Sequence, residues 1–295
     1  MSDLFNTDLL INRDGAVFHL NLNPGDIADD IILVGDPGRV KQVSDRFDEK
    51  LVIRENREFV THTGLIGGHK ISVISTGIGT DNIDIVVNEL DALVNIDLRN
   101  RMIRKEHHQL NLIRLGTSGL LDPEISPGSF ILSRISGGLD GTIYFYRETE
   151  PFMLDDLSER FIRHFSWNKN LSRPYFLYAS EILADRFQSP SVIPGISISA
   201  PGFYGPQFRT LRLHPFIDDF LERVVRFSYN DLRISNFEME SSALYALSRS
   251  LGHEAVTLCV GIANRITNEF LDDYKVHVDR LITYVLKQLT GQDHG

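Results

Sequence analysis

Ile31-Ile32-Leu33-Val34-Gly35-Asp36-Pro37-Gly38-Arg39 is the stretch on which the predicted fold depends. Its four apolar residues predict a buried strand, and the Gly-Asp-Pro sequence after them predicts a tight turn. Asp36 is a favourable helix cap and Pro37 a favourable first helical residue, so an ordinary strand-to-helix connection explains the turn by itself. Gly35 would also let backbone N–H groups approach an anion, and Arg39 would supply positive charge beside it.

The same alternation of strand and helix continues along the chain. Short apolar runs predict buried strands, and three longer stretches repeat apolar residues at helical spacing. The predicted strands are Ile31–Val34, Ile71–Ser75, Leu112–Leu115, Phe130–Ser133, Ile196–Ser199 and Val256–Ile262, and the predicted helices are Ile83–Val94, Glu238–Leu251 and Tyr274–Leu289. This alternation indicates an α/β fold, which we predict to be a single-domain three-layer α/β/α sandwich with a mixed central sheet.

Length, charge and cysteine content narrow the classes of function. The 295 residues suffice for one large domain, and we take residues 1–295 as one because no repeat or linker interrupts them. A net charge of −10 argues against a nucleic-acid surface, and no apolar run approaches membrane-spanning length. The first residues lack a basic region before an apolar stretch, so we expect no secretory signal. Cys259, the only cysteine, excludes an intrachain disulfide and fits a reducing cytoplasm.

Arg114 is unusual because it lies inside the apolar run Leu112-Ile113-Arg114-Leu115. Burying an unpaired guanidinium is costly, so something anionic must meet it. Thr117 and Ser118 follow on a predicted glycine-bounded turn and offer hydroxyl and amide donors at the strand end. Phosphate fits this arrangement, and a structural salt bridge to a carboxylate fits it equally well.

The stretch Gly202-Phe203-Tyr204-Gly205-Pro206-Gln207-Phe208-Arg209 combines an aromatic face, a carboxamide and a guanidinium in a loop. An aromatic ring can stack on a pyrimidine, and Gln207 offers a donor and an acceptor to an imide edge. Arg209 can donate to a carbonyl oxygen, and more strongly as that oxygen gains negative charge. These eight residues alone are also compatible with a plain turn.

Glu238 and Glu240 flank Met239 where a helix is predicted to begin. The helix dipole favours acidic residues at that position, and carboxylates can also accept hydrogen bonds from sugar hydroxyls. A glycosidase pair is disfavoured because residues two apart point in different directions. His19 lies between apolar residues, where a packing histidine is the commoner case. The segment Gly77–Asn82 has two of the three glycines of a dinucleotide fingerprint and is weak support for a Rossmann site.

Five segments, in this order, resemble the uridine phosphorylases of the nucleoside phosphorylase superfamily, over a region from about Val17 to Arg265. They are Gly35-Asp36-Pro37-x-Arg39, Ser75-Thr76-Gly77-Ile78-Gly79, Arg114-x-Gly116-Thr117-Ser118-Gly119, Phe203 to Arg209, and Glu238-Met239-Glu240-Ser241. The resemblance implies phosphate binding by Gly35, Arg39, Arg114 and Thr117, with Arg57 reaching a neighbouring subunit's phosphate. It implies ribose binding by Glu238, Met239 and Glu240 with His19 of a neighbour, and uracil binding by Phe203, Gln207 and Arg209.

The resemblance also implies the reaction and the assembly. Uridine and phosphate would give uracil and ribose 1-phosphate through an oxocarbenium-like state without a covalent intermediate, and Arg114, Gln207 and Arg209 would be the catalytic residues. The enzyme would need no cofactor and would be a cytoplasmic homo-oligomer, a dimer or a hexamer, with shared active sites. Some relatives hold a monovalent cation, such as K⁺, through a glutamate that corresponds to Glu58, but Asn82 departs from their usual turn. The basic stretch Arg99–Gln109 is longer than usual.

Three alternatives belong to other classes of function. A purine nucleoside phosphorylase of the same fold would place an aspartate where this chain has Asn264-Arg265, and an arginine cannot act as that acid at neutral pH. A nucleosidase would use water and would not need the arginines at positions 39, 57 and 114. A non-catalytic nucleoside-binding protein would tolerate loss of a motif residue, and each motif is present here.

Overall fold

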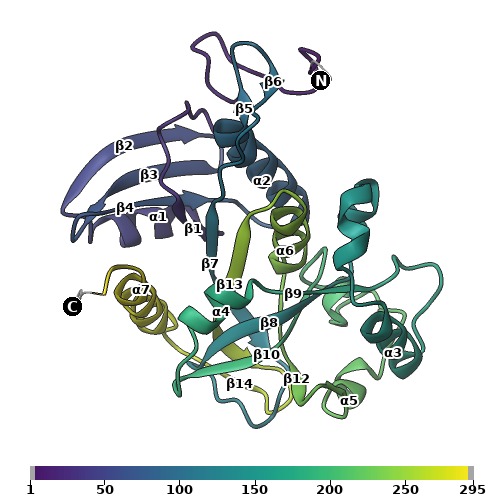
Figure 1. Ribbon diagram of the computed structural model, residues 1–295. Helices are drawn as coiled ribbons and strands as arrows, with labels where there is room; N and C mark the ends of the chain where they lie inside the picture. The colour runs from purple at the N-terminus through teal and green to yellow at the C-terminus, as the bar shows by residue number, and fades with distance from the viewer. Residues whose placement is uncertain (1–3, 292–295) are drawn as a thin grey trace.

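Strands and helices alternate through residues 4–291, which the computed structural model describes (Figure 1). The strands are β1 Asp30–Val34, β2 Glu49–Asn56, β3 Phe59–Ile66, β4 His69–Ser75, β5 Ile96–Asp97, β6 Met102–Ile103, β7 Asn111–Leu120, β8 Phe130–Gly138, β9 Tyr175–Tyr178, β10 Val192–Ser199, β11 Ser228–Tyr229, β12 Leu232–Glu238, β13 Glu254–Asn264 and β14 Glu269–Phe270. The helices are α1 Pro37–Ser44, α2 Thr80–Asn95, α3 Asp155–Phe165, α4 Glu181–Arg186, α5 Phe220–Val224, α6 Ser241–Ser250 and α7 Lys275–Thr290, with short 3₁₀ turns η1 Thr142–Phe145, η2 Arg147–Phe152 and η3 Gly205–Gln207. The first three residues, at the start predicted to lack a signal, and the last four lie outside the described residues.

One mixed sheet of twelve strands forms the centre of the molecule. Ten of them follow the order β11-β12-β10-β8-β13-β7-β1-β4-β3-β2, while β9 pairs with β8 and β14 with β13. Strands β4, β1, β7 and β13 run parallel to one another, and β8, β10 and β12 form a second parallel set. The end of β12 pairs antiparallel with the end of β7, where Phe237 lies opposite Gly119. The carboxyl ends of two parallel sets therefore meet, and this position is where α/β sheets hold ligands.

Helices cover the sheet on both sides, which confirms the predicted α/β architecture. Helix α6 packs against α2 and lies on β8 and β13, whereas α7 lies against β7 and β13 on the other side of β13 (Figure 1). Apolar residues recur along α7, and Val278, Leu281, Ile282 and Val285 are buried. Burial of such a stripe, rather than helix propensity, supplies most of the stability of a helix of this kind.

Two predicted boundaries are wrong, and both errors lie beside the candidate site. Strand β7 continues through Thr117 and Ser118, where a turn was expected, because β13 pairs with it on one side as far as Leu120. The start of the helix predicted over Glu238–Leu251 also shifts: Glu238 ends β12, and α6 begins only at Ser241. In both cases the pairing of neighbouring strands overrides the local signal of glycine or of helical periodicity.

Asp36 caps α1 and Pro37 begins it, as the opening stretch of the sequence predicted. The carboxylate of Asp36 accepts a hydrogen bond from the backbone N–H of Gly38 at 2.8 Å.

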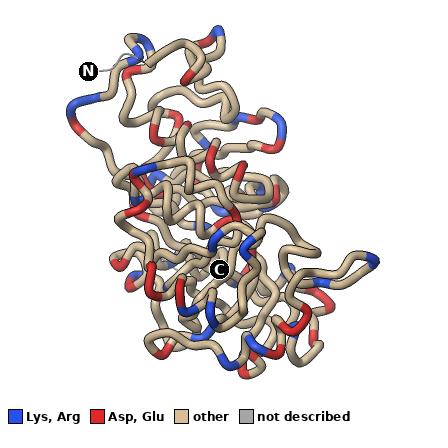
Figure 2. Tube along the Cα trace, turned by 90° about the vertical axis from the view of Figure 1, so that its right-hand side faces the viewer, with Lys and Arg blue, Asp and Glu red and all other residues tan. Residues whose placement is uncertain are grey.

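Basic and acidic positions alternate along the trace in Figure 2 rather than forming separate faces. Within the described residues, no helix combines the length and the apolar character that crossing a membrane requires.

Candidate active site

A cavity of about 630 Å³ lies at the carboxyl ends of β1, β4, β7, β10, β12 and β13. Most of the predicted binding residues line it. From the predicted phosphate, ribose and base groups, the lining includes Gly35, Arg39, Arg114, Thr117, Glu238, Met239, Glu240, Phe203, Gln207 and Arg209. The fold thus brings together segments that are up to about two hundred residues apart in the chain.

Two buried arginines form one end of the cavity. Arg39 on α1 is 8% exposed, and its Nη1 donates to the backbone oxygen of Leu115 at 3.2 Å. Burial, together with the adjacent charge of Arg114, lowers the pKa of Arg39. Within the described part of the chain Arg39 makes no ion pair, so no contacting carboxylate neutralises the charge of this one arginine.

Arg114 on β7 meets two carboxylates of the same chain. Its Nη2 forms a short ion pair with Glu240, and its Nη1 lies 3.5 Å from Glu238 Oε2. Although burial opposes the charge, these two carboxylates raise the pKa of Arg114 above its usual value. The Nε of Arg114 is buried and has no hydrogen-bond partner among the described residues. The salt-bridge interpretation is therefore realised, and one donor of the guanidinium stays unused.

The guanidinium of Arg114 fits only because residue 116 is glycine. A β-carbon at Gly116 would overlap Arg114 Nη1 and lie 3.0 Å from Cys259 Sγ. Cys259 itself is fully buried, as predicted, and burial raises the pKa of its thiol to about 12. The cysteine is therefore a neutral packing partner of Arg114 rather than a nucleophile.

Glu240 lies between Arg114 and the turn that follows β4. The backbone N–H of Gly79 donates to Glu240 Oε1 at 2.8 Å, while Oε2 faces Arg114. Burial raises the pKa of Glu240, even though Arg114 favours its ionised form. A carboxylate that is 3% exposed and lines a cavity is available to accept hydrogen bonds from hydroxyl groups of a ligand.

Glu238 has a different environment from Glu240. Its carboxylate accepts hydrogen bonds from the backbone N–H groups of Glu240 and Ser241, both at 3.0 Å, and from the hydroxyl of Ser199. These contacts tie the end of β12 to the first turn of α6. Glu238 therefore stabilises the start of α6, which is one of the two roles that the sequence allowed for these acidic residues.

A loop after β10 forms the other end of the cavity. Gln207 is 3% exposed, and the guanidinium of Arg209 stacks on the ring of Phe203 at 4.3 Å. Burial lowers the pKa of Arg209. The Phe203 ring remains half exposed, so one aromatic face is free to contact a planar ligand.

Arg265, the residue that follows β13, holds this loop through hydrogen bonds to its backbone. Its Nη1 donates to the backbone oxygen of Gln207 at 2.5 Å, and its Nη2 to that of Phe208 at 3.4 Å. Burial, with a contribution from the charge of Arg209, lowers the pKa of Arg265 to about 10, so the group remains protonated at neutral pH. Two cationic guanidinium groups are thus associated with this loop: Arg209, which lines the cavity, and Arg265, which is bonded to the loop backbone.

His19 and Arg57 do not line this cavity. Arg57 is exposed at the turn between β2 and β3 with a left-handed φ of 56°, and its guanidinium lies 6.0 Å from the Phe18 ring. His19 is bonded to Glu89 of α2. Sequence reasoning missed Glu89, although a carboxylate among Val86, Val87 and Leu90 on the apolar face of a predicted helix was a usable signal.

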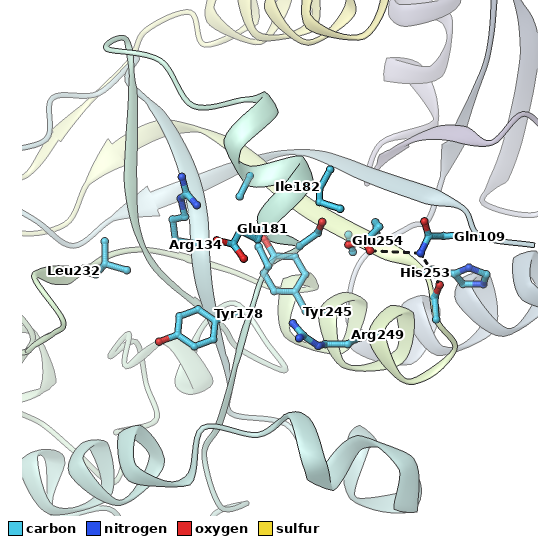
Figure 3. Close-up of a pocket in the computed structure, with 15 residues that line it drawn as sticks. Gln109, Arg134, Tyr178, Glu181, Ile182, Leu232, Tyr245, Arg249, His253 and Glu254 are labelled. Atoms are coloured by element: carbon cyan, nitrogen blue, oxygen red, sulfur yellow. Dashed lines mark hydrogen bonds between the residues drawn. The ribbon is translucent and has the colours of Figure 1, made fainter.

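A second cavity, of about 690 Å³, lies near the amino ends of β12 and β13, between α4 and α6 (Figure 3). Of the described residues that line it, none belongs to the predicted phosphate, ribose or base groups. Its two arginines are less buried than those of the first cavity: Arg134 is half-buried and pairs with Asp185 at 2.7 Å, and Arg249 is exposed and lies 5.2 Å from the Phe152 ring. Figure 3 shows Glu254 and Gln109 bonded to each other at one end of this cavity.

This chain is similar in sequence and in structure to known nucleoside phosphorylases. The family described as the phosphorylase superfamily matches residues 29–288. A uridine phosphorylase of Thermococcus kodakarensis is 33% identical over 88% of this chain and 81% of its own length. A uridine phosphorylase of Haemophilus influenzae is 27% identical over 86% of this chain and 88% of its length. A solved Trypanosoma brucei nucleoside phosphorylase, described as showing uridine phosphorylase activity, is 29% identical with a TM-score of 0.87, covering 97% of this chain and 100% of that one.

Proposed function

The chain belongs to the phosphorylase superfamily, and from this premise we propose that it is a uridine phosphorylase, which converts uridine and phosphate into uracil and ribose 1-phosphate. One observation carries the proposal. A single cavity is lined by the buried arginines Arg39 and Arg114, by the carboxylate of Glu240 in contact with Arg114, and by Gln207 with Arg209 from the loop after β10. Those three sets of groups match the phosphate, the ribose and the base of one reaction.

The reaction moves a ribosyl group between two acceptors. A phosphate oxygen forms a bond to the anomeric carbon as the bond from that carbon to the base nitrogen breaks, and the electron pair of the broken bond stays on uracil. Positive charge develops on the sugar ring and negative charge on the base. Because every electron and atom is supplied by the two substrates, we propose that the reaction requires no organic cofactor and no covalent enzyme intermediate.

Phosphate is bound at the end of the cavity that Arg39 and Arg114 form. The unused Nε of Arg114, the hydroxyl of Thr117 and the backbone beside Gly35 supply donors for its oxygens. Arginine suits this role because its planar array of donors matches an oxyanion. Glu240, which forms an ion pair with Arg114, also couples the phosphate end to the ribose.

Ribose lies beside Met239 and Glu240. Glu240 accepts hydrogen bonds from ribose hydroxyls through the lone pairs that its contacts with Gly79 and Arg114 leave free, and Met239 packs against the sugar. Glu238 contributes from the end of β12, where its bonds to the start of α6 hold the other two residues in place. Nearby carboxylates also stabilise the positive charge that develops on the ring.

The base stacks on Phe203 and is bonded by Gln207 and Arg209. As the glycosidic bond breaks, negative charge spreads over the carbonyl oxygens of uracil, and Arg209 binds that anion better than the neutral base. Arg265 adds a second positive charge and holds the loop through the backbone of Gln207. A preorganised donor of this kind contributes about 3–4 kcal/mol to lowering the barrier.

A second copy of the chain completes each site. His19 and Arg57 lie next to the same aromatic side chain, Phe18, which is 40% exposed, and away from their own cavity. In a homo-oligomer, a dimer or a hexamer, His19 would reach the neighbour's ribose and Arg57 the neighbour's phosphate. The exposed apolar residues Leu51 and Ile53 of β2, close to Arg57 in sequence, are suited to such a contact.

The side chains around Glu58 bear on whether a monovalent cation binds there. The Nδ2 of Asn82 faces Glu58 Oε1 at 3.4 Å, so an amide donor lies where an oxygen ligand would be needed. A cation of the K⁺ type requires several oxygen ligands, and these two side chains fit it poorly. We therefore assign no step of the reaction to a cation, and we expect equal rates in potassium and in tetramethylammonium salts.

We further propose that the reaction takes place in the cytoplasm. The single cysteine is buried and free, and that state is compatible with a reducing compartment. Fractionation of the source cells with an antibody against the chain tests this location, since recovery in a membrane or secreted fraction would contradict it.

The function is tested by incubating the purified protein with uridine, with and without phosphate, and separating the products, with inosine as the control nucleoside. Uracil release that depends on phosphate, with inosine unchanged, is the expected result. Phosphate-independent cleavage would instead indicate a nucleosidase. Cleavage of inosine would mean that the loop of Gln207 and Arg209 accepts purines, and a folded protein that cleaves neither would be a binding protein.

A further inference from the structure

The loop that carries His19 is held by a buried carboxylate of a neighbouring helix. Glu89 lies on α2 and is 6% exposed. The His19 ring nitrogen Nδ1 lies 2.6 Å from Glu89 Oε1, and the backbone N–H of His19 is 3.0 and 3.1 Å from the two oxygens. The backbone N–H of Leu20 donates to Oε2 at 2.8 Å. Three donors from two consecutive residues therefore converge on one carboxylate.

This contact determines how the imidazole is presented. A carboxylate can only accept hydrogen bonds, so the Nδ1 that faces it carries the proton. The other nitrogen, Nε2, has no hydrogen-bond partner among the described residues, and the His19 side chain is 26% exposed. The bond to Glu89 thus selects one tautomer and leaves Nε2 free to bond with a group outside this chain.

Asn56, the last residue of β2, also holds the loop that carries His19. Its Nδ2 donates to the backbone oxygens of Phe18 and His19 at 3.2 and 2.8 Å, and Asn56 directly precedes Arg57. The Phe18 ring meets the His19 ring edge-on at 5.1 Å. His19 and Arg57 are therefore already fixed relative to each other within one chain, before any second copy binds.

We propose that Glu89 is a positioning residue for phosphorolysis, which orients His19 so that Nε2 points toward the ribose bound by a neighbouring subunit. This inference rests on the proposed function and on the role given there to His19. The physical gain is preorganisation, because a side chain held in its productive rotamer loses less entropy when the substrate binds. A carboxylate that served only to stabilise the fold would not couple its effect to the imidazole.

The test is a double-mutant cycle on Glu89→Gln and His19→Ala, read as kcat and KM for uridine and for phosphate. Glutamine keeps the size of the side chain but replaces one acceptor oxygen by a donor. We expect Glu89→Gln to lower kcat/KM for uridine about 10-fold, as loss of a histidine's orienting partner does elsewhere. The KM for phosphate should stay within about twofold. In the His19→Ala background, the same substitution should have almost no further effect.

Asp91→Asn is the matched control, since Asp91 also lies on α2 and also faces a histidine, with Oδ1 3.2 Å from His253 Nε2. It should leave both KM values unchanged. An equal penalty for Glu89→Gln with and without His19 would show a purely structural role and overturn the inference, as would wild-type kinetics for Glu89→Gln. Glu89→Asp, which retains the carboxylate, should recover part of the activity if the first variant folds poorly. If the wild-type protein releases no uracil with phosphate, the proposed function fails first.

Discussion

The cavity at the carboxyl ends of β12 and β13 and the cavity near their amino ends are similar in volume, about 630 and 690 Å³. They differ in where their charged groups lie. In the cavity at the carboxyl ends, Arg39, Arg114, Glu238 and Glu240 are each less than a tenth exposed. In the cavity at the amino ends, Arg134 is half-buried beside Asp185, and Arg249 is exposed beside Phe152.

This difference shows that size is a poor guide to a functional site and buried charge a better one. Removing an ionised group from water is costly unless strong partners replace the solvent. Burying four charged side chains around an open cavity costs desolvation free energy. A ligand that bonds to those charges can offset part of this cost. The larger cavity carries no comparable cost, because surface ion pairs contribute about 0–1 kcal/mol. The first three of the following experiments compare one position in each cavity, and the last concerns an arginine that is bonded to the loop of the candidate site.

The largest effect is expected from the buried arginine of the candidate site. Arg114→Ala should reduce phosphate-dependent kcat/KM by roughly 10³-fold or more, because phosphate loses its main donor. It should also lower the free energy of unfolding by about 3–5 kcal/mol, since Glu240 and Glu238 are left buried without their partner. Steady-state assays and denaturant unfolding measure the two effects.

Arg249→Ala, in the other cavity, should change kcat/KM by less than about twofold. If both substitutions had the same effect on activity, the distinction between the cavities would be wrong. Arg114→Lys, which keeps a positive charge between the two glutamates, separates the losses: it should restore most of the stability but little of the rate.

A second pair of arginines tests the base end of the site. Arg209→Ala should lower kcat for uridine about 10²–10³-fold, as expected for loss of a donor to the charge that develops on the base. Its stability should change little, because Arg209 is half-buried and forms no ion pair among the described residues. Arg134→Ala should leave kcat unchanged. A normal kcat in Arg209→Ala, with only KM raised, would mean that the arginine binds the ground state and the transition state equally.

Two hydroxyl groups are expected to give opposite outcomes. Thr117→Val should raise the KM for phosphate about 5–10-fold, the equivalent of one hydrogen bond of about 1 kcal/mol, without changing stability. Ser180→Ala should leave the kinetics unchanged but lower stability by about 1 kcal/mol, because the Ser180 hydroxyl caps α4 by accepting from the backbone N–H of Leu183. The KM for phosphate and the melting temperature of each variant measure these effects. A loss of stability in Thr117→Val, or a raised KM for phosphate in Ser180→Ala, would contradict the corresponding assignment.

The smallest effect concerns the titration of Arg265. Its pKa is lowered to about 10, so the folded protein loses this proton at a lower pH than the unfolded chain does. The guanidinium is charged at neutral pH, and its contribution to activity is lost as the pH rises through about 10. The ratio of kcat/KM for the wild type to that for Arg265→Gln should be constant near neutral pH and should fall above about pH 10. A constant ratio throughout, with folding verified by circular dichroism, would mean that the charge of Arg265 is unimportant.

Local patterns predicted the elements that surround the site well. Helix α2 and helix α7 lie within a few residues of the predicted ranges, because an apolar stripe at helical spacing must be buried against a sheet. The turn Gly35-Asp36-Pro37 was predicted for the same kind of reason, since the cap at Asp36 and the ring of Pro37 act within four residues. The five motifs of the sequence identified the superfamily.

Other features were beyond local patterns. The extension of β7 through Thr117 and Ser118 depends on pairing with β13, which follows about 140 residues later. Glu238 and Glu240 have different partners: Glu238 bonds to the start of α6 and to Ser199, and Glu240 bonds to Arg114 and Gly79. Ser199 and Gly79 come from two other segments of the chain. Sequence alone described these glutamates as a pair with two possible roles.

The sequence by itself determined the fold class, the family and the residue types available for phosphate, ribose and base. Short-range effects such as apolar periodicity, helix capping and turn chemistry suffice for that, and they act over a few residues. Only the tertiary structure decided which cavity holds the buried charges, that Arg114 forms an ion pair with Glu240, and that Glu89 holds His19. Burial and long-range ion pairing depend on how distant segments pack, and that information exists only once the sheet has formed.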